Sequence, residues 1–135
     1  MSRQFVIELA NRPGELAHIA KALAARGVDI RHISSAGAGD CACAFVATSD
    51  PVGMRIVLDG LGHKYIEGAP VLVEIDDVPG AFACVAAKLA EADVRIYGSL
   101  VVGHKPGKVE ITFSVDDEAK AREVLGISDR VGVND

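Results

Sequence analysis

Two short turns with the same residue pattern carry the groups in this sequence that are best suited to binding a charged ligand. The turns are Asn11-Arg12-Pro13-Gly14-Glu15-Leu16 and Asp77-Val78-Pro79-Gly80-Ala81-Phe82. Each lies between a strand-like and a helical stretch, so Pro should preset the first helical turn, and Asn11 or Asp77 should accept from its free N–H groups. Glycine opens the backbone to a second molecule, and a helix N-terminus favours a carboxylate or a phosphate. The pattern predicts two anion-binding corners.

Cysteine and histidine are the other residue types that could carry chemistry here. Cys41 and Cys43 share one strand face by parity, and with a histidine they could bind a soft metal ion. Position 43 aligns with the apolar Val109 in the repeat described below, so we interpret Cys43 as a small core residue and predict no metal. No nucleophile has a recognisable base and orienting partner, so we predict no catalytic residues, no cofactor and no enzymatic activity.

Composition narrows the classes of partner. The chain has 135 residues, half of them apolar, and its 14 Lys and Arg against 19 Asp and Glu leave a net charge of -5. An acidic chain with no Trp is unsuited to nucleic acid, which needs basic and stacking residues. No apolar run approaches the roughly 18 residues of a membrane helix. No signal peptide precedes the first strand pattern, and an odd number of cysteines favours a reducing setting, so we predict a cytoplasmic protein.

The two turns belong to a longer internal repeat. When the sequence is compared with itself at a shift of 66 positions, residues 8–50 match residues 74–116 without a gap, and the match ends with Asp50 aligned with Asp116. The shared residues include prolines and glycines as well as apolar positions. Such matching indicates that the same arrangement of strands and helices occurs twice.

Periodicity within each copy predicts the order βαββαβ. In the first copy we expect strands at 5–9, 28–35, 41–48 and 64–67, a helix after Gly14 and a second helix at 51–61. In the second copy we expect strands at 71–75, 94–102, 108–115 and 128–133, a helix after Gly80 and a second helix at 117–125. This order is the ferredoxin-like α+β plan, an antiparallel sheet with helices on one face. We assign one unit to residues 1–68 and one to 69–135. We expect them to pack side by side, because a unit of about 65 residues is marginally stable alone.

The repeat also predicts which face of the third strand is buried. Alignment with an apolar face in the second copy places three residues inward, namely Cys43, Phe45 and Ala47. The alternate residues Ala42, Ala44 and Val46 then face outward, with Lys108, Glu110 and Thr112 in the second copy. Neither outward face could stack bases, and the first could join a protein interface.

Taken together, the turns, the helical faces after them and the Val-x-Ile strand starts at 28–30 and 94–96 resemble a tandem pair of ACT domains. The resemblance covers residues 4–67 and 69–133. ACT domains are small regulatory modules, and in that family two units usually pair and bind amino acids at their interface. The turn and helix start of one unit, with a strand of its neighbour, hold the ligand's carboxylate and amino groups.

The resemblance implies a set of ligand-binding positions. They are Asn11, Arg12, Gly14, Glu15 and Leu16 in the first unit, and Asp77, Val78, Gly80, Ala81 and Phe82 in the second. The two sites need not be equivalent, because charged Asp77 replaces neutral Asn11 and uncharged Val78 replaces Arg12.

The sequence thus predicts an allosteric regulatory protein that binds a small molecule, which we expect to be an amino acid, and that has no chemistry of its own. We expect it to act through a homo-oligomer or through control of a partner enzyme or regulator, because the chain leaves no room for a catalytic domain. The alternative is a structural protein–protein interaction module with vestigial ligand sites.

Overall fold

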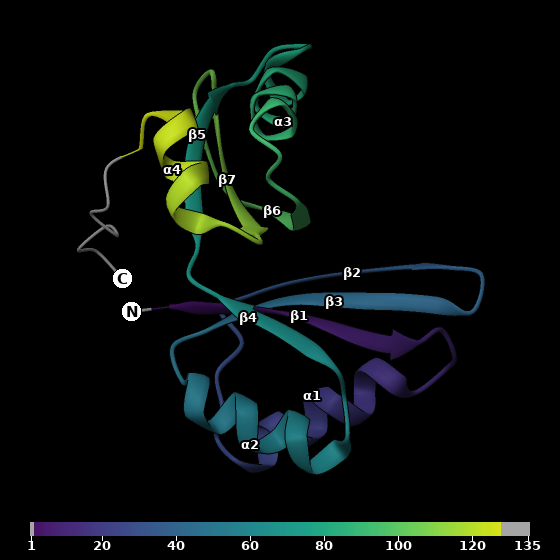
Figure 1. The fold of residues 1–135 in the computed structure, drawn as a ribbon. Helices are drawn as coiled ribbons and strands as arrows, with labels where there is room; N and C mark the ends of the chain where they lie inside the picture. The colour runs from purple at the N-terminus through teal and green to yellow at the C-terminus, as the bar shows by residue number, and fades with distance from the viewer. Residues whose placement is uncertain (1, 128–135) are drawn as a thin grey trace. The chain divides into compact units, whose positions relative to one another are not determined.

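The computed structural model describes residues 2–127, so the strand expected at 128–133 lies outside the described residues. The chain divides into two compact units, Met1–Gly68 and Ala69–Asp135. Each has its own antiparallel sheet and its own pair of helices, as Figure 1 shows. The ferredoxin-like α+β plan expected for both halves is confirmed. Within the described residues, none of the helices combines the length and the apolar character that crossing a bilayer would require.

The first unit contains all six expected elements. In chain order they are β1 (Arg3–Ala10), α1 (Glu15–Ala25), β2 (His32–Ala38), β3 (Cys41–Thr48), α2 (Pro51–Leu61) and β4 (Tyr65–Gly68). The sheet order is β2-β3-β1-β4, which makes β2 and β4 the edge strands. Both helices lie on the same face of this sheet (Figure 1). The second strand starts at His32 rather than at residue 28 as expected, and Val28 is a buried core residue of the segment before the strand.

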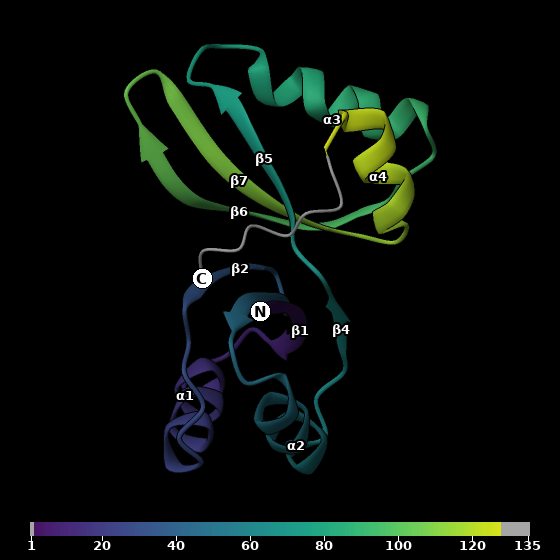
Figure 2. The same ribbon diagram turned by 90° about the vertical axis from the view of Figure 1, so that its left-hand side faces the viewer.

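The second unit repeats this plan. Its described elements are β5 (Val71–Asp76), α3 (Ala81–Glu91), β6 (Ile96–Lys105), β7 (Lys108–Val115) and α4 (Glu118–Leu125). The sheet order is β5-β7-β6, and both helices again cover one face (Figure 2). At the end of α3, Asp93 adopts the left-handed conformation that Gly27 adopts after α1, with φ values of 58° and 74°.

Alternation along the strands builds both cores. On β1 the expected inward residues Phe5, Ile7 and Leu9 are all buried, and they pack with Ile19 and Leu23 of α1. Residues from β3 and α2 complete the first core cluster: Ala44, Val46, Met54, Val57 and Leu58. The second core is built in the same way, from Val71, Val85, Leu89, Val109, Ile111, Phe113 and Val115, among others.

The gapless alignment of the two halves is wrong in the hairpin of the second unit. In β6, Val101 pairs with Ile111 and Gly103 pairs with Glu110, so Val102 is an extra residue in a β-bulge. The shift between the halves is therefore 66 positions before Val102 and 67 after it. The capping residues agree with this shift, since Asp50 begins α2 and Asp117, rather than Asp116, begins α4.

The extra residue reverses the expected faces of β3. Of the three residues that we expected inward, Phe45 and Ala47 are buried but do not belong to the core cluster beneath the helices. A one-residue change of register moves every side chain to the opposite face of a strand. Ala44 and Val46 lie in the core, and Ala42 packs against it, although we expected all three to face outward. Cys43 is exposed rather than a core residue, and it lies on the face of the sheet opposite to the helices.

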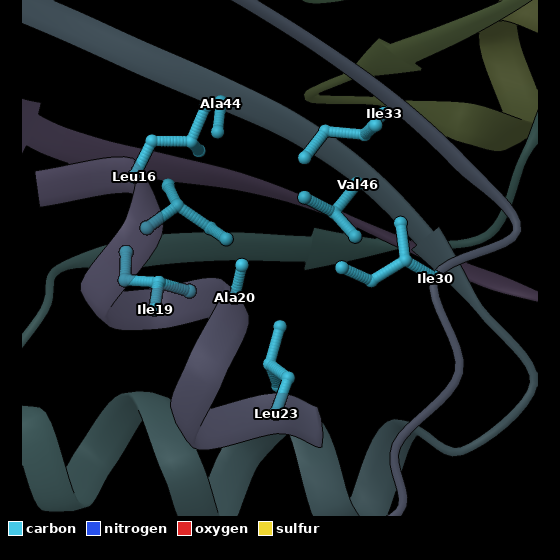
Figure 3. A pocket seen from close by; sticks show the side chains of 9 residues that line it. Leu16, Ile19, Ala20, Leu23, Ile30, Ile33, Ala44 and Val46 are labelled. Atoms are coloured by element: carbon cyan, nitrogen blue, oxygen red, sulfur yellow. The ribbon is translucent and has the colours of Figure 1, made fainter. Parts of the chain in front are cut away.

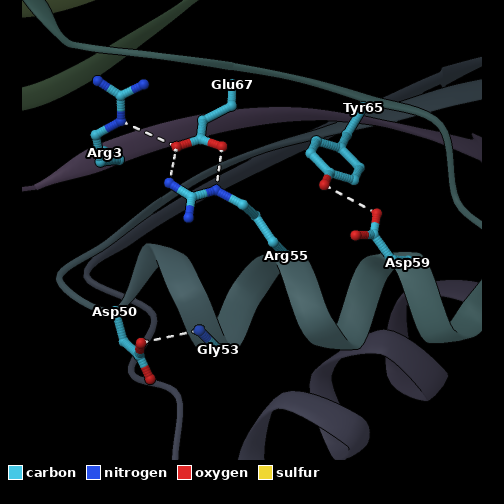
Figure 4. Close-up of polar contacts among 7 residues, drawn as sticks. All are labelled: Arg3, Asp50, Gly53, Arg55, Asp59, Tyr65 and Glu67. Carbon is cyan, nitrogen blue, oxygen red and sulfur yellow. Dashed lines mark hydrogen bonds and ion pairs between the residues drawn. The ribbon is translucent and has the colours of Figure 1, made fainter.

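A network of ion pairs holds β4, the last strand of the first unit, against β1 and α2. Glu67 on β4 accepts two hydrogen bonds from Arg55 of α2, both at 2.6 Å, and one from Nε of Arg3 at 3.0 Å. Tyr65 donates to Asp59 of α2 at 2.9 Å. Figure 4 shows these contacts joining β1, α2 and β4, so polar groups as well as apolar packing position the edge strand.

Candidate functional site

The two corners predicted from the sequence are tight turns, and each leads directly into a helix. In the first, the N–H of Glu15 donates to the carbonyl of Arg12 at 3.4 Å, and Gly14 has φ 90° and ψ -13°. A proline followed by a glycine at positive φ is the arrangement of a type II turn. Gly80 has nearly the same angles, φ 90° and ψ -14°. Pro therefore presets the turn before the helix, and not the first helical turn that we expected.

Both corners leave the second and third amides of their helices without a protein acceptor. Gly14 and Gly80 are the N-cap residues of α1 and α3, and no side chain caps either helix. Within residues 2–127, the backbone N–H groups of Leu16 and Ala17 have no hydrogen-bond acceptor, and the same is true of Phe82 and Ala83. These free donors point along the positive end of a helix dipole, which favours a negatively charged ligand group.

The other two helices of the chain are capped by carboxylates. Asp50 accepts from the N–H of Gly53 at 2.9 Å at the start of α2, and Asp117 accepts from the N–H of Lys120 at 3.0 Å at the start of α4. An Asp N-cap stabilises a helix by about 0.5–2 kcal/mol relative to Ala. The first helix of each unit lacks this stabilisation, and its amides stay available to an outside molecule.

The capping roles that we predicted for Asn11 and Asp77 are both wrong, because no side chain caps α1 or α3. The Asn11 side chain turns toward the β2–β3 hairpin, where Nδ2 donates to the carbonyl of Gly39 at 2.8 Å. Its backbone N–H donates to the carbonyl of Asp40 at 3.0 Å. A Cβ on Gly37 would come within 2.8 Å of the Asn11 amide group, so only glycine allows this close approach. Asn11 therefore joins the first corner to the hairpin tip.

Charges differ between the two corners. At the first, Nε of Arg12 lies 2.5 Å from Oε1 of Glu15, so each charge has a partner. At the second, Asp77 is exposed, and within the described part of the chain its carboxylate has no ion-pair partner. Its backbone N–H donates to the carbonyl of Gly107, as that of Asn11 does to the first hairpin. The second corner thus has a free carboxylate beside free amides, which suits an ammonium group next to a carboxylate.

Apolar side chains border both corners. Leu16 lines a small pocket between α1 and the sheet, whose lining is entirely apolar (Figure 3). Its other lining residues are Ile7, Ile19, Ala20, Leu23, Ile30, Ile33, Ala44 and Val46. The interior has room for about one water molecule. At the second corner, Val78 and Phe82 are 58% and 46% exposed, and Phe82 stacks on the buried Phe113 with ring centroids 5.9 Å apart.

All ten residues predicted to bind a ligand therefore lie at the surface of two separate corners. Glu15 and Ala81 are half-buried, and the others are exposed: Asn11, Arg12, Gly14, Leu16, Asp77, Val78, Gly80 and Phe82. Each set of five is brought together by its own turn. Their role in binding stays a prediction.

Sequence reasoning missed the exposure of β2, a second feature of the first site. All seven residues of this edge strand are exposed, including Ile33 at 45%. The sequence did carry a signal for this exposure, because residues 34–39 are all small and their side chains cannot cover the backbone of an edge strand.

Comparison with known proteins agrees with this arrangement. Residues 3–59 match the ACT domain family model. This match covers most of the first unit, which is therefore similar to an ACT domain. The second unit repeats its fold, so the resemblance to a pair of ACT domains is confirmed. A comparison with curated protein sequences gives no match.

Solved structures with similar folds span both ACT-like units. Protein BT0572 from Bacteroides thetaiotaomicron has a TM-score of 0.67 and 22% identity, and the match covers 92% of this chain and 85% of that one. The ligand-free regulatory subunit of aspartate kinase from Thermus thermophilus has a TM-score of 0.61 and 18% identity, with 93% and 87% covered. The corresponding subunit from Thermus flavus has a TM-score of 0.59 and 19% identity, with 93% and 90% covered. At these identities the likeness shows the fold.

Proposed function

We propose that this chain is a regulatory protein that binds an amino acid at its two uncapped corners and thereby changes its own assembly or the activity of a partner. The observation that carries the proposal is the contrast between helices. No side chain accepts from the free N–H groups at the start of α1 and α3, whereas at the start of α2 and α4 Asp50 and Asp117 each accept from one N–H group.

The chemistry of the second corner favours a zwitterion. The amides of Phe82 and Ala83 can donate to the ligand's carboxylate, and the carboxylate of Asp77 can accept from its ammonium group. Exposed Val78 and Phe82 provide apolar contact for a ligand side chain. At the first corner the Arg12–Glu15 pair offers no net charge, so we propose that this corner binds the same class of ligand more weakly.

Association of two copies of the chain would allow ligand binding to change the protein's function. A ligand shifts an equilibrium only by its difference in affinity between two states. The edge strand β2 offers unpaired backbone groups to a second copy, and it borders the apolar pocket that Leu16 lines. A ligand held between a corner and a neighbouring copy would stabilise the assembled state. The Thermus proteins with the same fold are named as regulatory subunits, which supports control of a partner rather than catalysis by this chain.

Isothermal titration with each of the twenty amino acids at millimolar concentration tests the proposal. We expect at least one to bind, and its methyl ester to bind at least tenfold more weakly, because the ester has no carboxylate for the free amides. The N-acetyl derivative should also lose affinity, because it has no ammonium group for Asp77. If none of the twenty amino acids binds, or if the amino acid and its methyl ester bind with equal affinity, the proposal is refuted.

Amide chemical shifts locate the site within the chain. The N–H resonances of Leu16, Ala17, Phe82 and Ala83 should move on titration, with the larger change at the second corner. Gly53 is the matched control, because Asp50 already occupies its N–H. Shifts confined to Gly53 and its neighbours would place binding elsewhere.

One observation favours a second function, that of a protein–protein interaction module. An edge strand exposed along its whole length is a template for pairing with another chain. If sedimentation shows the same assembly with and without amino acids, and no amino acid binds, the module explains the chain better than the sensor does.

A further inference from the structure

The two units carry different chemistry at the same place on their open sheet faces, the faces away from the helices. In the second unit this place holds a cluster of ion pairs. Nζ of Lys105 lies 3.1 Å from Oε2 of Glu74 and 2.9 Å from Oε1 of Glu110. Lys108 pairs with Asp76 on the same face. The hydrogen bonds that Lys105 donates to Glu110 and to Glu74 raise the pKa of Lys105, so both carboxylates share one ammonium cation.

Strand register identifies the corresponding residues in the first unit. Glu74 lies opposite Glu110 on β7, and Glu8 lies opposite Cys43 on β3. Lys105 lies opposite Lys108, and Ala38 lies opposite Cys41. The first unit therefore keeps the glutamate, replaces its lysines by Ala38 and Cys41, and replaces the second glutamate by Cys43.

The substitution leaves Glu8 without the ion pair that its counterpart Glu74 makes. In the portion of the chain that the structure describes, the carboxylate of Glu8 makes no ion pair, whereas Glu74 contacts Lys105. Two thiols and one carboxylate on this face can become anionic. The cross-strand neighbours of the thiols on β2 are alanines, and Lys64, which lies opposite Glu8 on the other side of β1, makes no ion pair with it among the described residues. The geometry leaves a position for an external cation where the second unit places the ammonium of Lys105.

The two thiols are accessible and unobstructed. Cys41 and Cys43 are both exposed, and they are two residues apart on β3, so they project from the same face. Their cross-strand neighbours on β2 are Ala38 and Ala36. On β1, Ala10 lies opposite Cys41. Alanine methyl groups are too short to cover a neighbouring sulfur.

The spacing allows both sulfurs to reach one ion. Residues two apart on an antiparallel strand have Cα atoms about 6.8 Å apart. Two thiolates on one ion, each about 2.3 Å from it, are at most about 4.6 Å apart. Each sulfur therefore has to lean about 1 Å toward the other, which rotation about χ1 permits.

We propose that Cys41 and Cys43 form a two-thiolate site for a soft monovalent cation of the Cu(I) type, with Glu8 supplying a nearby negative charge. Thiolate ligands favour Cu(I), and two of them suffice for it, whereas a structural zinc ion takes four ligands. Among the residues 2–127, no three Cys, His, Asp or Glu side chains are arranged to hold a metal ion, which argues against zinc here. Binding displaces the two thiol protons to solvent and changes no oxidation state.

This site is separate from both amino-acid corners, so it does not depend on the function proposed above. It also reverses our prediction of no metal. That prediction rested on burial of Cys43, and the structure exposes this residue.

Competition for Cu(I) tests the site. The reduced full chain is mixed anaerobically with Cu(I) held by a chromophoric chelator, and transfer is followed by loss of the chelator's colour. We expect one Cu(I) per chain, retained through gel filtration. The variants Cys41→Ser and Cys43→Ser should each lower the affinity at least 100-fold, and Glu8→Gln should lower it less, by about threefold.

Cys84→Ser is the matched control, because Cys84 is also exposed but lies alone on α3. This variant should bind Cu(I) as the wild type does. Cu(I) should also protect Cys41 and Cys43, and not Cys84, from alkylation as read by mass spectrometry. The proposal is overturned if no Cu(I) transfers, if the double variant Cys41→Ser/Cys43→Ser still binds it, or if protection follows Cys84.

Discussion

Replacing Glu67 by Gln should destabilise the first unit through loss of a single carboxylate. The Glu67 side chain is 16% exposed and accepts three hydrogen bonds from Arg55 and Arg3 (Figure 4). Gln keeps the shape but loses the charge, and its NH2 group faces guanidinium donors that it cannot satisfy. The change therefore removes the charge-assisted part of each bond.

The expected cost follows from the exposure of the groups. A hydrogen bond to a charged group contributes about 1.5–3 kcal/mol when well buried. The guanidinium side chains of Arg3 and Arg55 are 37% and 41% exposed, so solvent screens much of this contribution. We expect Glu67→Gln to lower the free energy of unfolding by about 2 kcal/mol at pH 7, measured by urea denaturation.

The effect should depend on pH in one direction. Hydrogen bonds from Arg55, with a further one from Arg3, hold the pKa of Glu67 below its ordinary value of 4.5 despite burial, which raises it. A carboxyl group with a lowered folded pKa stabilises the fold above its unfolded pKa, and this stabilisation is lost as the pH falls through the folded value. The difference between wild type and variant should be constant from pH 7 to about pH 5 and shrink below pH 4.5.

Glu8→Gln is the control, because Glu8 lies in the same unit and has no ion pair within the described residues. Its unfolding free energy should change by less than about 0.5 kcal/mol. A cost below 0.5 kcal/mol for Glu67→Gln, or a cost that persists undiminished at pH 3, would show that the network does not stabilise the fold as argued.

Four further outcomes are expected. Asp77→Asn should weaken amino-acid binding about fivefold by calorimetry, because it removes the partner of the ligand's ammonium group; unchanged affinity would exclude that contact. Gly37→Val should cost about 1–3 kcal/mol in urea denaturation, since its Cβ would meet the Asn11 amide at 2.8 Å; a neutral result would mean that the corner and the hairpin are not coupled. Asp93→Gly should stabilise the chain by about 0.5–1 kcal/mol, because Asp93 has φ 58°; destabilisation would point to an unrecognised role of its carboxylate. Scanning calorimetry should give one cooperative transition, because each unit is small, and two separated transitions would contradict joint unfolding of the units.

Local patterns were sufficient for the elements and for much of the core. Phe5, Ile7 and Leu9 alternate on β1 and are buried as expected, because alternation reports directly which face of a strand is apolar. The helices after Gly14 and Gly80 were also predictable, since Pro-Gly marks a turn and the apolar spacing beyond it is helical.

The register of the third strand could not be predicted in this way. Sequence comparison at one shift treats both hairpins as equal in length, but the bulge at Val102 adds a residue that only the pairing of β6 with β7 reveals. That single residue decides whether Cys43 belongs to the core or to the open face, and with it the chemistry available there.

The sequence by itself determined that the chain contains the same order of strands and helices twice, with a Pro-Gly turn before the first helix of each copy. It could do so because turn-forming residues and the spacing of apolar residues are local properties of the chain. Only the tertiary structure decided what the polar groups of those turns do. Asn11 was expected to cap α1, but the hairpin tip lies within hydrogen-bond distance and takes its amide instead. A side chain's partner depends on which distant segment the fold brings beside it, and for this reason the free amides of the two corners became visible only in three dimensions.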